Sequence, residues 1–255
     1  MSSVAEIVDE ILDGQGYAIL PGLMTREEAA EARSLALVEA GRPNPSGNSP
    51  RNQRIKHGAA RHLLHQGEIF ERLVQDPSTI EVAEALLGDD MTLSSYSCRV
   101  MWPGAIEMGV HVDYPYWAMP GPYAIRPALM LQVIWMLQDF TEDNGATLLM
   151  PRSQMLATQP DAERFRRDAV MVTGSAGTAV VSHGLLWHDT SQNRTAEPRV
   201  SLLINYGNKV IRPLDPEINQ VPPEVLARAT PKLRQLLGLE WQKSLARELE
   251  RRKLY

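Results

Sequence analysis

The sequence predicts an all-β core of the jelly-roll class that is buttressed by α-helices at both ends of the chain. Residues 1–90 place apolar side chains at helical spacing, and residues 222–255 do so again. Residues 91–207 show short, closely spaced strand and turn patterns instead. Because the strands do not alternate with helices, a two-layer β fold is favoured over βαβ units. We expect the 255 residues to form a single domain.

The N-terminal part predicts three helical stretches and one strand. Apolar positions at helical spacing predict a helix over residues 4–12, followed by a short strand at 17–21. Thr25 is a good N-cap residue for a second helix that reaches about Gly41. Residues 69–87 predict a further helical region, interrupted by a proline and closed by a glycine.

Residues 41–61 predict a long loop between the second helix and the third helical region. The segment is rich in Gly, Pro, Asn, Ser and basic residues and has no periodicity. Loops of about 20 residues in compact domains are usually functional lids or disordered. Its basic side chains, His57 among them, could attract an anionic substrate, or the segment could be no more than a solvated basic loop.

The central part predicts six strands, at residues 92–102, 108–114, 129–137, 146–150, 178–182 and 200–206. The Asn144-Gly145 pair has the sequence of a tight hairpin turn, which would make the fourth strand a return strand beside the third. Residues 115–127 contain four prolines and three aromatic side chains, so they cannot form a helix or a central strand. We expect an aromatic loop over the mouth of a pocket there.

Composition narrows the cellular setting and the partners. The net charge of −5 gives no reason to expect nucleic acid as a partner. Cys98 is the only cysteine, so no internal disulfide can form and a cytoplasmic location is expected. The N-terminus lacks the pattern of a signal peptide, and no apolar run is long enough to predict a membrane span. The C-terminal helices could pack on the barrel or on a second subunit of a homodimer through Leu233, Leu236, Leu237, Trp241, Leu245 and Leu249.

The short motif His111-x-Asp113 is the strongest indication of chemistry. Two residues apart on a strand, the imidazole and the carboxylate would point to the same face. With a second imidazole from elsewhere, for which we favour His188, they would form a facial triad that leaves three positions on a ferrous ion open for oxygen chemistry. By itself an H-x-D motif is weak, because a chain with six histidines can contain one by accident.

The residues that follow the motif make the resemblance specific, because residues 94–206 resemble the phytanoyl-CoA dioxygenase family, whose members are Fe(II)- and 2-oxoglutarate-dependent oxygenases. The matching segments are Met108-x-x-His111-x-Asp113, then Trp135-x-x-x-Asp139-Phe140-Thr141-Glu142-Asp143-Asn144-Gly145-Ala146-Thr147-x-x-x-Pro151-x-Ser153, then His188-x-x-x-x-Asn193-x-x-x-x-x-Arg199.

This resemblance implies a double-stranded β-helix with His111, Asp113 and His188 as iron ligands. It also implies that Arg199, eleven residues after the distal histidine, binds the far carboxylate of 2-oxoglutarate. The chemistry agrees, since neutral imidazoles and one carboxylate suit ferrous iron and a guanidinium can grip a carboxylate with two parallel hydrogen bonds. The cofactors expected are Fe(II), 2-oxoglutarate and O2. Two further residues match co-substrate positions, Thr190 as a hydroxyl donor and Trp135 as a pocket wall, although a core tryptophan is an equal interpretation.

His183 competes with His188 for the third ligand position. It lies five residues earlier, and Arg194 follows it at the same spacing of eleven, so spacing alone does not decide. We favour His188 because Asn193 and Arg199 complete its pattern, and we expect His183 to support the site or to lie in the core.

The function expected from these residues is hydroxylation of an unactivated C–H bond in a small metabolite, such as an amino-acid derivative or a natural-product intermediate. Desaturation, cyclisation or epoxidation would use the same site, and a catalytically silent metabolite-binding relative or a cupin-like metalloenzyme without 2-oxoglutarate are alternatives. Halogenating relatives carry a small residue where this chain has Asp113. Candidate substrate contacts are Tyr114, Tyr116, Trp117, Arg126 and His57, although for Arg126 we favour a simple loop salt bridge.

Overall fold

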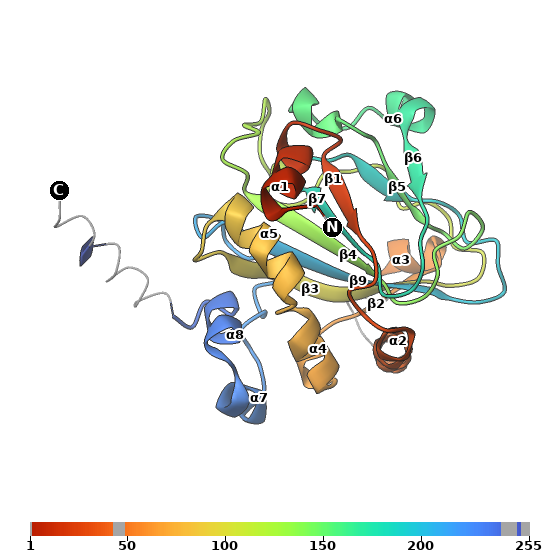
Figure 1. Ribbon diagram of the computed structural model, residues 1–255. Coiled ribbons are helices and arrows are strands. Elements are labelled where there is room, and N and C mark those ends of the chain that lie inside the picture. Colours follow the sequence, from red (N-terminus) through yellow and green to blue (C-terminus); the bar gives the residue numbers. More distant parts are fainter. Residues whose placement is uncertain (1, 43–48, 241–248, 251–255) are drawn as a thin grey trace.

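A computed structural model describes residues 2–42, 49–240 and 249–250 of the chain (Figure 1). The N-terminal helices begin at the residues that the capping patterns indicate. α1 (Val4–Leu12) is capped by Ser3, and α2 (Arg26–Ala40) by Thr25, each with a glutamate that completes a capping box. Three further helices follow, namely α3 (Pro50–Arg54), α4 (Glu68–Leu73) and α5 (Pro77–Leu87).

Two antiparallel sheets form the β core. The six-stranded sheet has the order β1 (Tyr17–Leu20), β7 (Ala179–His183), β4 (Met130–Met136), β9 (Arg199–Gly207), β3 (Thr92–Met101) and β2 (His57–Ala60). The three-stranded sheet has the order β6 (Val170–Val172), β5 (Thr147–Leu149) and β8 (His188–Thr190). This arrangement of antiparallel strands confirms the predicted jelly-roll class, although the strands do not close into a barrel.

The large sheet separates the helices from a cavity. On β4, Val133 and Trp135 pack with the N-terminal helices in the main hydrophobic core, and α1 and α5 lie across this face in Figure 1. The alternate residues of the same strand, Gln132 and Ile134, line a cavity of about 330 Å³ that β5 and β8 also border. Because side chains alternate along a strand, one sheet can bury an apolar face and line a polar cavity with the other.

Residues 41–61 are not the long loop that their composition predicted. Positions 43–48 lie outside the described residues, but α3 and β2 occupy most of the remainder. β2 pairs with β3 from His57 to Ala60 and forms the edge of the large sheet. Its sequence, His-Gly-Ala-Ala, has low β-propensity, so tertiary pairing rather than local preference makes it a strand.

The predicted hairpin at Asn144-Gly145 is also wrong. β4 pairs with β7 and β9, whereas β5 pairs with β6 and β8, so the turn carries the chain from one sheet to the other. Gly145 has φ +86°, which explains the glycine, and Asn144 holds the turn through hydrogen bonds to the backbone of Asp139 and Thr141. A glycine turn predicts a reversal of the chain, but it does not predict which strands then pair.

The remaining helices are short. They are α6 (Ala162–Asp168), α7 (Pro223–Arg228) and α8 (Pro231–Leu236), together with 3-10 turns at Leu63–His65, Tyr116–Ala118 and Ser153–Leu156. Leu233, Leu236 and Leu237 join the main core, so α8 packs on the helix-covered side of the sheet. Leu249 is exposed, and Trp241 and Leu245 lie outside the described residues. No helix in the described ranges has the length and apolar character needed to span a membrane.

Two buried tyrosines connect the large sheet to α4. The hydroxyl of Tyr206 donates to the carbonyl oxygen of Val74 at 2.8 Å, and that of Tyr96 donates to Phe70 at the same distance. Replacing Tyr206 by Phe should lower the free energy of unfolding by about 1–2 kcal/mol, because the buried carbonyl loses its partner. Urea unfolding measures this. Tyr17→Phe, whose hydroxyl has no partner within the described ranges, is the control, and an equal effect of both changes would contradict the assignment.

Candidate metal centre

His111 and His188 are brought together by a single pair of backbone hydrogen bonds. The amide of His111 donates to the carbonyl of His188 at 3.1 Å, and the reverse bond has the same length. Residues 108–114 therefore make one isolated bridge instead of the predicted strand. Further along, the amide of Asp113 donates to Gly184 at 2.9 Å. The segment thus lies along the loop and strand that carry His188, which is what places its side chains.

Asp189 fixes the start of this segment. Its carboxylate accepts hydrogen bonds from the amides of Met108 at 3.0 Å and of Gly109 at 3.0 and 3.2 Å. Gly109 has φ +103°, a conformation that a side chain would strain. Asp189 was not among the predicted site residues. Its position next to a ligand was visible in the sequence, but its contact with residues about eighty positions earlier was not.

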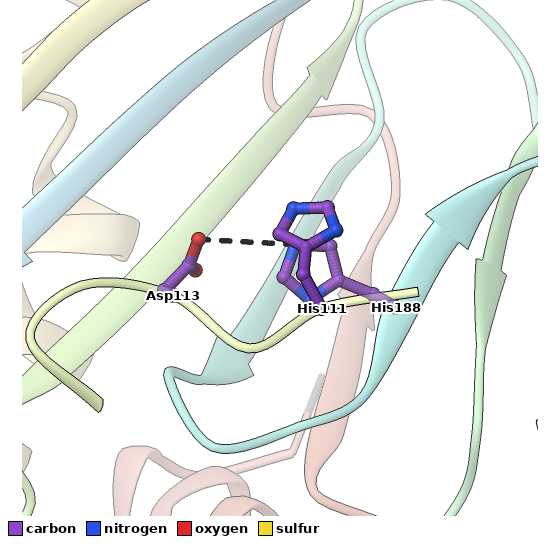
Figure 2. A group of neighbouring side chains, drawn as sticks. All are labelled: His111, Asp113 and His188. Carbon is purple, nitrogen blue, oxygen red and sulfur yellow. Dashed lines mark ion pairs between the residues drawn. The ribbon is translucent and has the colours of Figure 1, made fainter. Parts of the chain in front are cut away.

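Ligand atoms of His111, Asp113 and His188 all lie within 4.8 Å of one another. Figure 2 shows the two imidazole rings beside each other and facing the carboxylate, with Nε2 of His188 at 3.8 Å from Oδ1 of Asp113. Nδ1 of His111 lies 3.0 Å from the carbonyl of Gly109, and Nδ1 of His188 lies 2.9 Å from that of Leu186. Since a carbonyl only accepts, both Nδ1 atoms carry the proton and both Nε2 lone pairs are free for a cation.

The electrostatics of the cluster favour a bound cation. Burial, with a smaller effect of the nearby His188, lowers the pKa of His111 to about 3, so its ring is neutral as a metal ligand must be. Burial also raises the pKa of Asp113, against the opposing influence of His188 and Asn205. The Oδ2 atom of Asp113 is buried without a hydrogen-bond partner. The neutral imidazole of His111, the Nε2 atom of His188 and an unsatisfied carboxylate oxygen fit Fe(II).

Arg199 is buried in the same cavity without a carboxylate. It is 1% exposed, and within the described part of the chain it forms no ion pair. Its guanidinium donates to Ser201 Oγ at 2.9 Å and to the carbonyl of Gly145, and it lies 4.6 Å from the ring centroid of Phe140. Burial lowers the pKa of Arg199 to about 9, and its Nε atom has no partner. A carboxylate ligand would satisfy both the charge and the free donor.

Asn193 shapes the connection between the last ligand and Arg199. Its side chain donates to the carbonyls of Met101 and Glu197, each at 2.9 Å, and accepts from the amide and hydroxyl of Thr195. It is fully buried, so these bonds replace solvent. The spacing His188-x4-Asn193-x5-Arg199 in the sequence thus corresponds to a fixed turn that returns the chain to β9.

Of the two residues predicted to contact the co-substrate together with Arg199, only Thr190 lies at the cavity. Thr190 lines the cavity, and its hydroxyl is buried without a partner. Trp135 is fully buried among the apolar residues on the opposite face of the sheet, so the prediction that it lines the pocket is wrong. Alternation decides this, because Gln132 and Ile134 of the same strand face the cavity.

Some of the predicted substrate contacts line the cavity and others do not. His57 and Trp117 line the cavity, and Trp117 is 51% exposed at its mouth. Tyr114 is in edge contact with Trp117 but borders a neighbouring groove. Tyr116 is 1% exposed and packs in a core cluster with Tyr123, so it is not a substrate contact. Arg126 pairs with Asp13 at 2.6 Å away from the cavity, which was the alternative interpretation.

The geometry excludes His183 as a ligand. Its Nδ1 atom accepts from the amide of Leu185 at 2.9 Å, and its Nε2 atom lies 3.2 Å from the carbonyl of Ile125. Both ring nitrogens are therefore occupied. Arg194, which matched His183 in spacing, pairs with the exposed Asp143 at 3.5 Å.

Sequence reasoning missed several polar residues of the cavity wall. Six of them lie on the face of the large sheet that points away from the helices, namely Ser95, Ser97, Arg99, Gln132, Ser201 and Asn205, and Arg61 directly follows β2. The signal was present as alternation of polar and apolar residues within the predicted strand at 92–102. The polar face of a strand usually meets solvent, and only the second sheet turns this one into a cavity wall.

Comparison with known proteins identifies the family. The model of the family described as "Phytanoyl-CoA dioxygenase (PhyH)" matches residues 12–201. The chain belongs to the phytanoyl-CoA dioxygenase family. Membership confirms the expected cofactors, which are Fe(II), 2-oxoglutarate and O2. It also confirms that the chain is an enzyme of the Fe(II)/2-oxoglutarate oxygenase class.

Individual relatives of this phytanoyl-CoA dioxygenase family member are more distant. The dioxygenase af480 of Aspergillus fumigatus is 28% identical over 239 residues, covering 89% of this chain and 75% of that protein. L-proline trans-4-hydroxylase of Streptomyces griseoviridis is 28% identical over 195 residues, covering 62% and 70%. Among solved structures, the epimerase SnoN in complex with Fe3+, alpha ketoglutarate and nogalamycin RO has the same fold, with a TM-score of 0.63, 20% identity and coverage of 83% and 86%.

The buried His183 predicts a pH dependence of stability. Burial lowers the pKa of His183 to about 4 from 6.5, so the unfolded chain takes up a proton below pH 6.5 that the folded chain refuses. Stability should therefore fall as pH decreases from 7 to 5, by up to about 1.4 kcal/mol per pH unit for such a group. The metal-free His183→Asn variant should show a shallower decline in urea unfolding, and an unchanged slope would contradict this cause.

Proposed function

We propose that this chain is an Fe(II)- and 2-oxoglutarate-dependent hydroxylase that acts on an unactivated C–H bond of a small metabolite and releases succinate and CO2. The observation that carries the proposal is the convergence of His111, Asp113 and His188 within 4.8 Å, beside a buried Arg199 without a carboxylate partner. A cation site and a co-substrate anchor thus share one cavity.

Each residue has a defined task in this proposal. His111, Asp113 and His188 would hold Fe(II), which when bound with 2-oxoglutarate activates O2 for attack on a C–H bond. Arg199 would orient 2-oxoglutarate by its far carboxylate, with Thr190 as a second donor. Because Arg199 is held by Ser201 and Gly145, the guanidinium is positioned before the co-substrate arrives.

The cavity supports a small substrate. Its volume of about 330 Å³ lies at the lower end for ligand sites and must also hold 2-oxoglutarate. Its walls combine the apolar side chains of Ile134, Leu203 and Trp117 with polar ones. An amino-acid derivative or a natural-product intermediate suits such a site, and a relative named L-proline trans-4-hydroxylase supports this range.

The experiment that tests the proposal is a metabolite-library screen for succinate release from 2-oxoglutarate with added Fe(II), with product masses read in parallel. A gain of one oxygen supports hydroxylation or epoxidation, whereas a loss of two hydrogens would identify desaturation or cyclisation. The absence of succinate with every metabolite and without one would favour a silent metabolite-binding protein. Oxidation of a metabolite without release of succinate would favour a cupin-like metalloenzyme that does not use 2-oxoglutarate.

Replacing Arg199 tests the co-substrate anchor separately. Arg199→Gln should raise the 2-oxoglutarate concentration needed for half-maximal succinate release by about a hundredfold, because a charge-assisted bond in a buried site is worth about 2–3 kcal/mol. Arg194→Gln is the matched control, since its guanidinium lies on the surface in a pair with Asp143. An equal 2-oxoglutarate requirement in both variants would contradict the assignment of Arg199.

A further inference from the structure

Two arginines besides Arg199, namely Arg61 and Arg99, line the cavity that contains His111, Asp113 and His188. Neither has a role in the proposed chemistry. Arg99 lies near the end of β3, opposite Ala59 of β2 and Ser201 of β9. Arg61 follows the last residue of β2 and borders the same cavity. Together they place two guanidinium groups on the wall nearest the β2 edge of the large sheet.

Neither arginine has a counter-ion among the residues whose structure is described. Within the ranges that the structure describes, Arg61 and Arg99 form no ion pair, and Nε of Arg61 is buried without a hydrogen-bond partner. Burial, with smaller contributions from the charges of Arg61 and Arg51, lowers the pKa of Arg99 to about 10. Both side chains are half-buried, and an uncompensated guanidinium in such a position costs stability, so the pair suits an anionic ligand.

The acidic residues of the cavity are committed elsewhere. Asp113 belongs to the metal cluster, and Asp189 accepts the amides of the segment that carries His111. Asp215 also borders the cavity, and its Oδ1 atom accepts from the amide of Glu217 at 3.0 Å. None of these carboxylates forms an ion pair with Arg61 or Arg99 in the described part of the chain, which leaves room for the anion of a bound molecule.

This pair is distinct from the co-substrate anchor. Arg199 lies opposite Met101, which is two residues beyond Arg99 on β3. Its guanidinium donates to Ser201 and Gly145. The charges that act on Arg99 are those of Arg61 and Arg51, and Arg51 donates to the carbonyl of Met108 at 2.7 Å. The charge of Arg99 in turn helps to lower the pKa of Arg199, so the two anion sites would be neighbours within one cavity.

We propose that Arg61 and Arg99 form a second anion site, which binds a carboxylate of the primary substrate while 2-oxoglutarate occupies Arg199. The part of this inference that places 2-oxoglutarate on Arg199 rests on the proposed function. Two guanidinium groups suit a carboxylate, because each can donate a charge-assisted hydrogen bond and together they fix its orientation. The reacting C–H bond would then be set by its distance from that carboxylate, which would give the enzyme its regioselectivity.

The first test uses protein loaded with Mn(II) and saturating 2-oxoglutarate, which blocks Arg199, and measures the melting temperature against propionate concentration. Propionate should raise the melting temperature of the wild type relative to chloride at equal ionic strength. The shift should be lost in Arg99→Gln and reduced in Arg61→Gln. Arg54→Gln is the matched control, because Arg54 lies in α3 of the same segment but does not border the cavity.

Three results would overturn the proposal. One is a propionate response of Arg99→Gln equal to that of the wild type. Another is stabilisation by sulfate but not by propionate, which would assign the site to a different anion. The third is a tenfold or larger loss of 2-oxoglutarate affinity in Arg99→Gln, measured by calorimetry, which would make Arg99 part of the co-substrate site.

A second measurement does not depend on ligand or turnover. Because the half-buried Arg99 has no counter-ion in the described part of the chain, Arg99→Gln should raise the melting temperature of the ligand-free protein by about 2–4 °C, the shift expected from a gain of about 1 kcal/mol at this size. An arginine that only supports the fold would lower it when replaced. If Mn(II) and 2-oxoglutarate fail to bind any variant, the proposed function fails, whereas this shift still tests the pair.

Discussion

The site depends on one pair of backbone hydrogen bonds, those between His111 and His188. They join a segment without regular structure to β8 of the small sheet, and they set the two imidazoles at a ring-centroid distance of 4.2 Å. Asp189 anchors the same segment through its carboxylate. The large sheet then supplies the opposite wall, so His188 of β8 and Arg199 of β9 come from different sheets and meet only because the sheets face a common cavity.

The arrangement keeps several polar groups buried and unsatisfied. They include Oδ2 of Asp113, the hydroxyl of Thr190 and Nε of Arg199. Each such group costs free energy that other parts of the fold must offset. The offset comes from the opposite face of the large sheet, where the apolar residues of β4 and β9 pack with α1, α2, α4 and α5. Apolar packing on one face of the sheet thus offsets the free-energy cost of the unsatisfied polar groups in the cavity on the other face. Functional sites in proteins are commonly stabilised in this way by the structure around them.

The sequence predicted the class of fold and most helix starts, the latter from local signals such as the capping residue Thr25. It also singled out His111, Asp113 and His188, which the structure brings into one cluster that could hold a metal ion, but only the resemblance to a family joined His188 to the local His111-x-Asp113 motif. It failed where pairing partners decide. The strand at β2, the sheet change at Gly145 and the contact of Asp189 with Gly109 join residues that are far apart or locally ambiguous. Trp135 was misplaced for the same reason, since periodicity gives two faces of a strand but does not say which one meets the cavity.

The central claim is that a metal ion and 2-oxoglutarate share one site between the two sheets. Calorimetric titration of the protein with Mn(II), with and without 2-oxoglutarate, tests it most directly, together with the reciprocal titration. If the two ligands share the site, each should increase the affinity for the other by the same factor, and the double variant His111→Ala/His188→Ala should abolish this coupling. Independent binding of Mn(II) and 2-oxoglutarate, or coupling that survives in the double variant, would contradict the account.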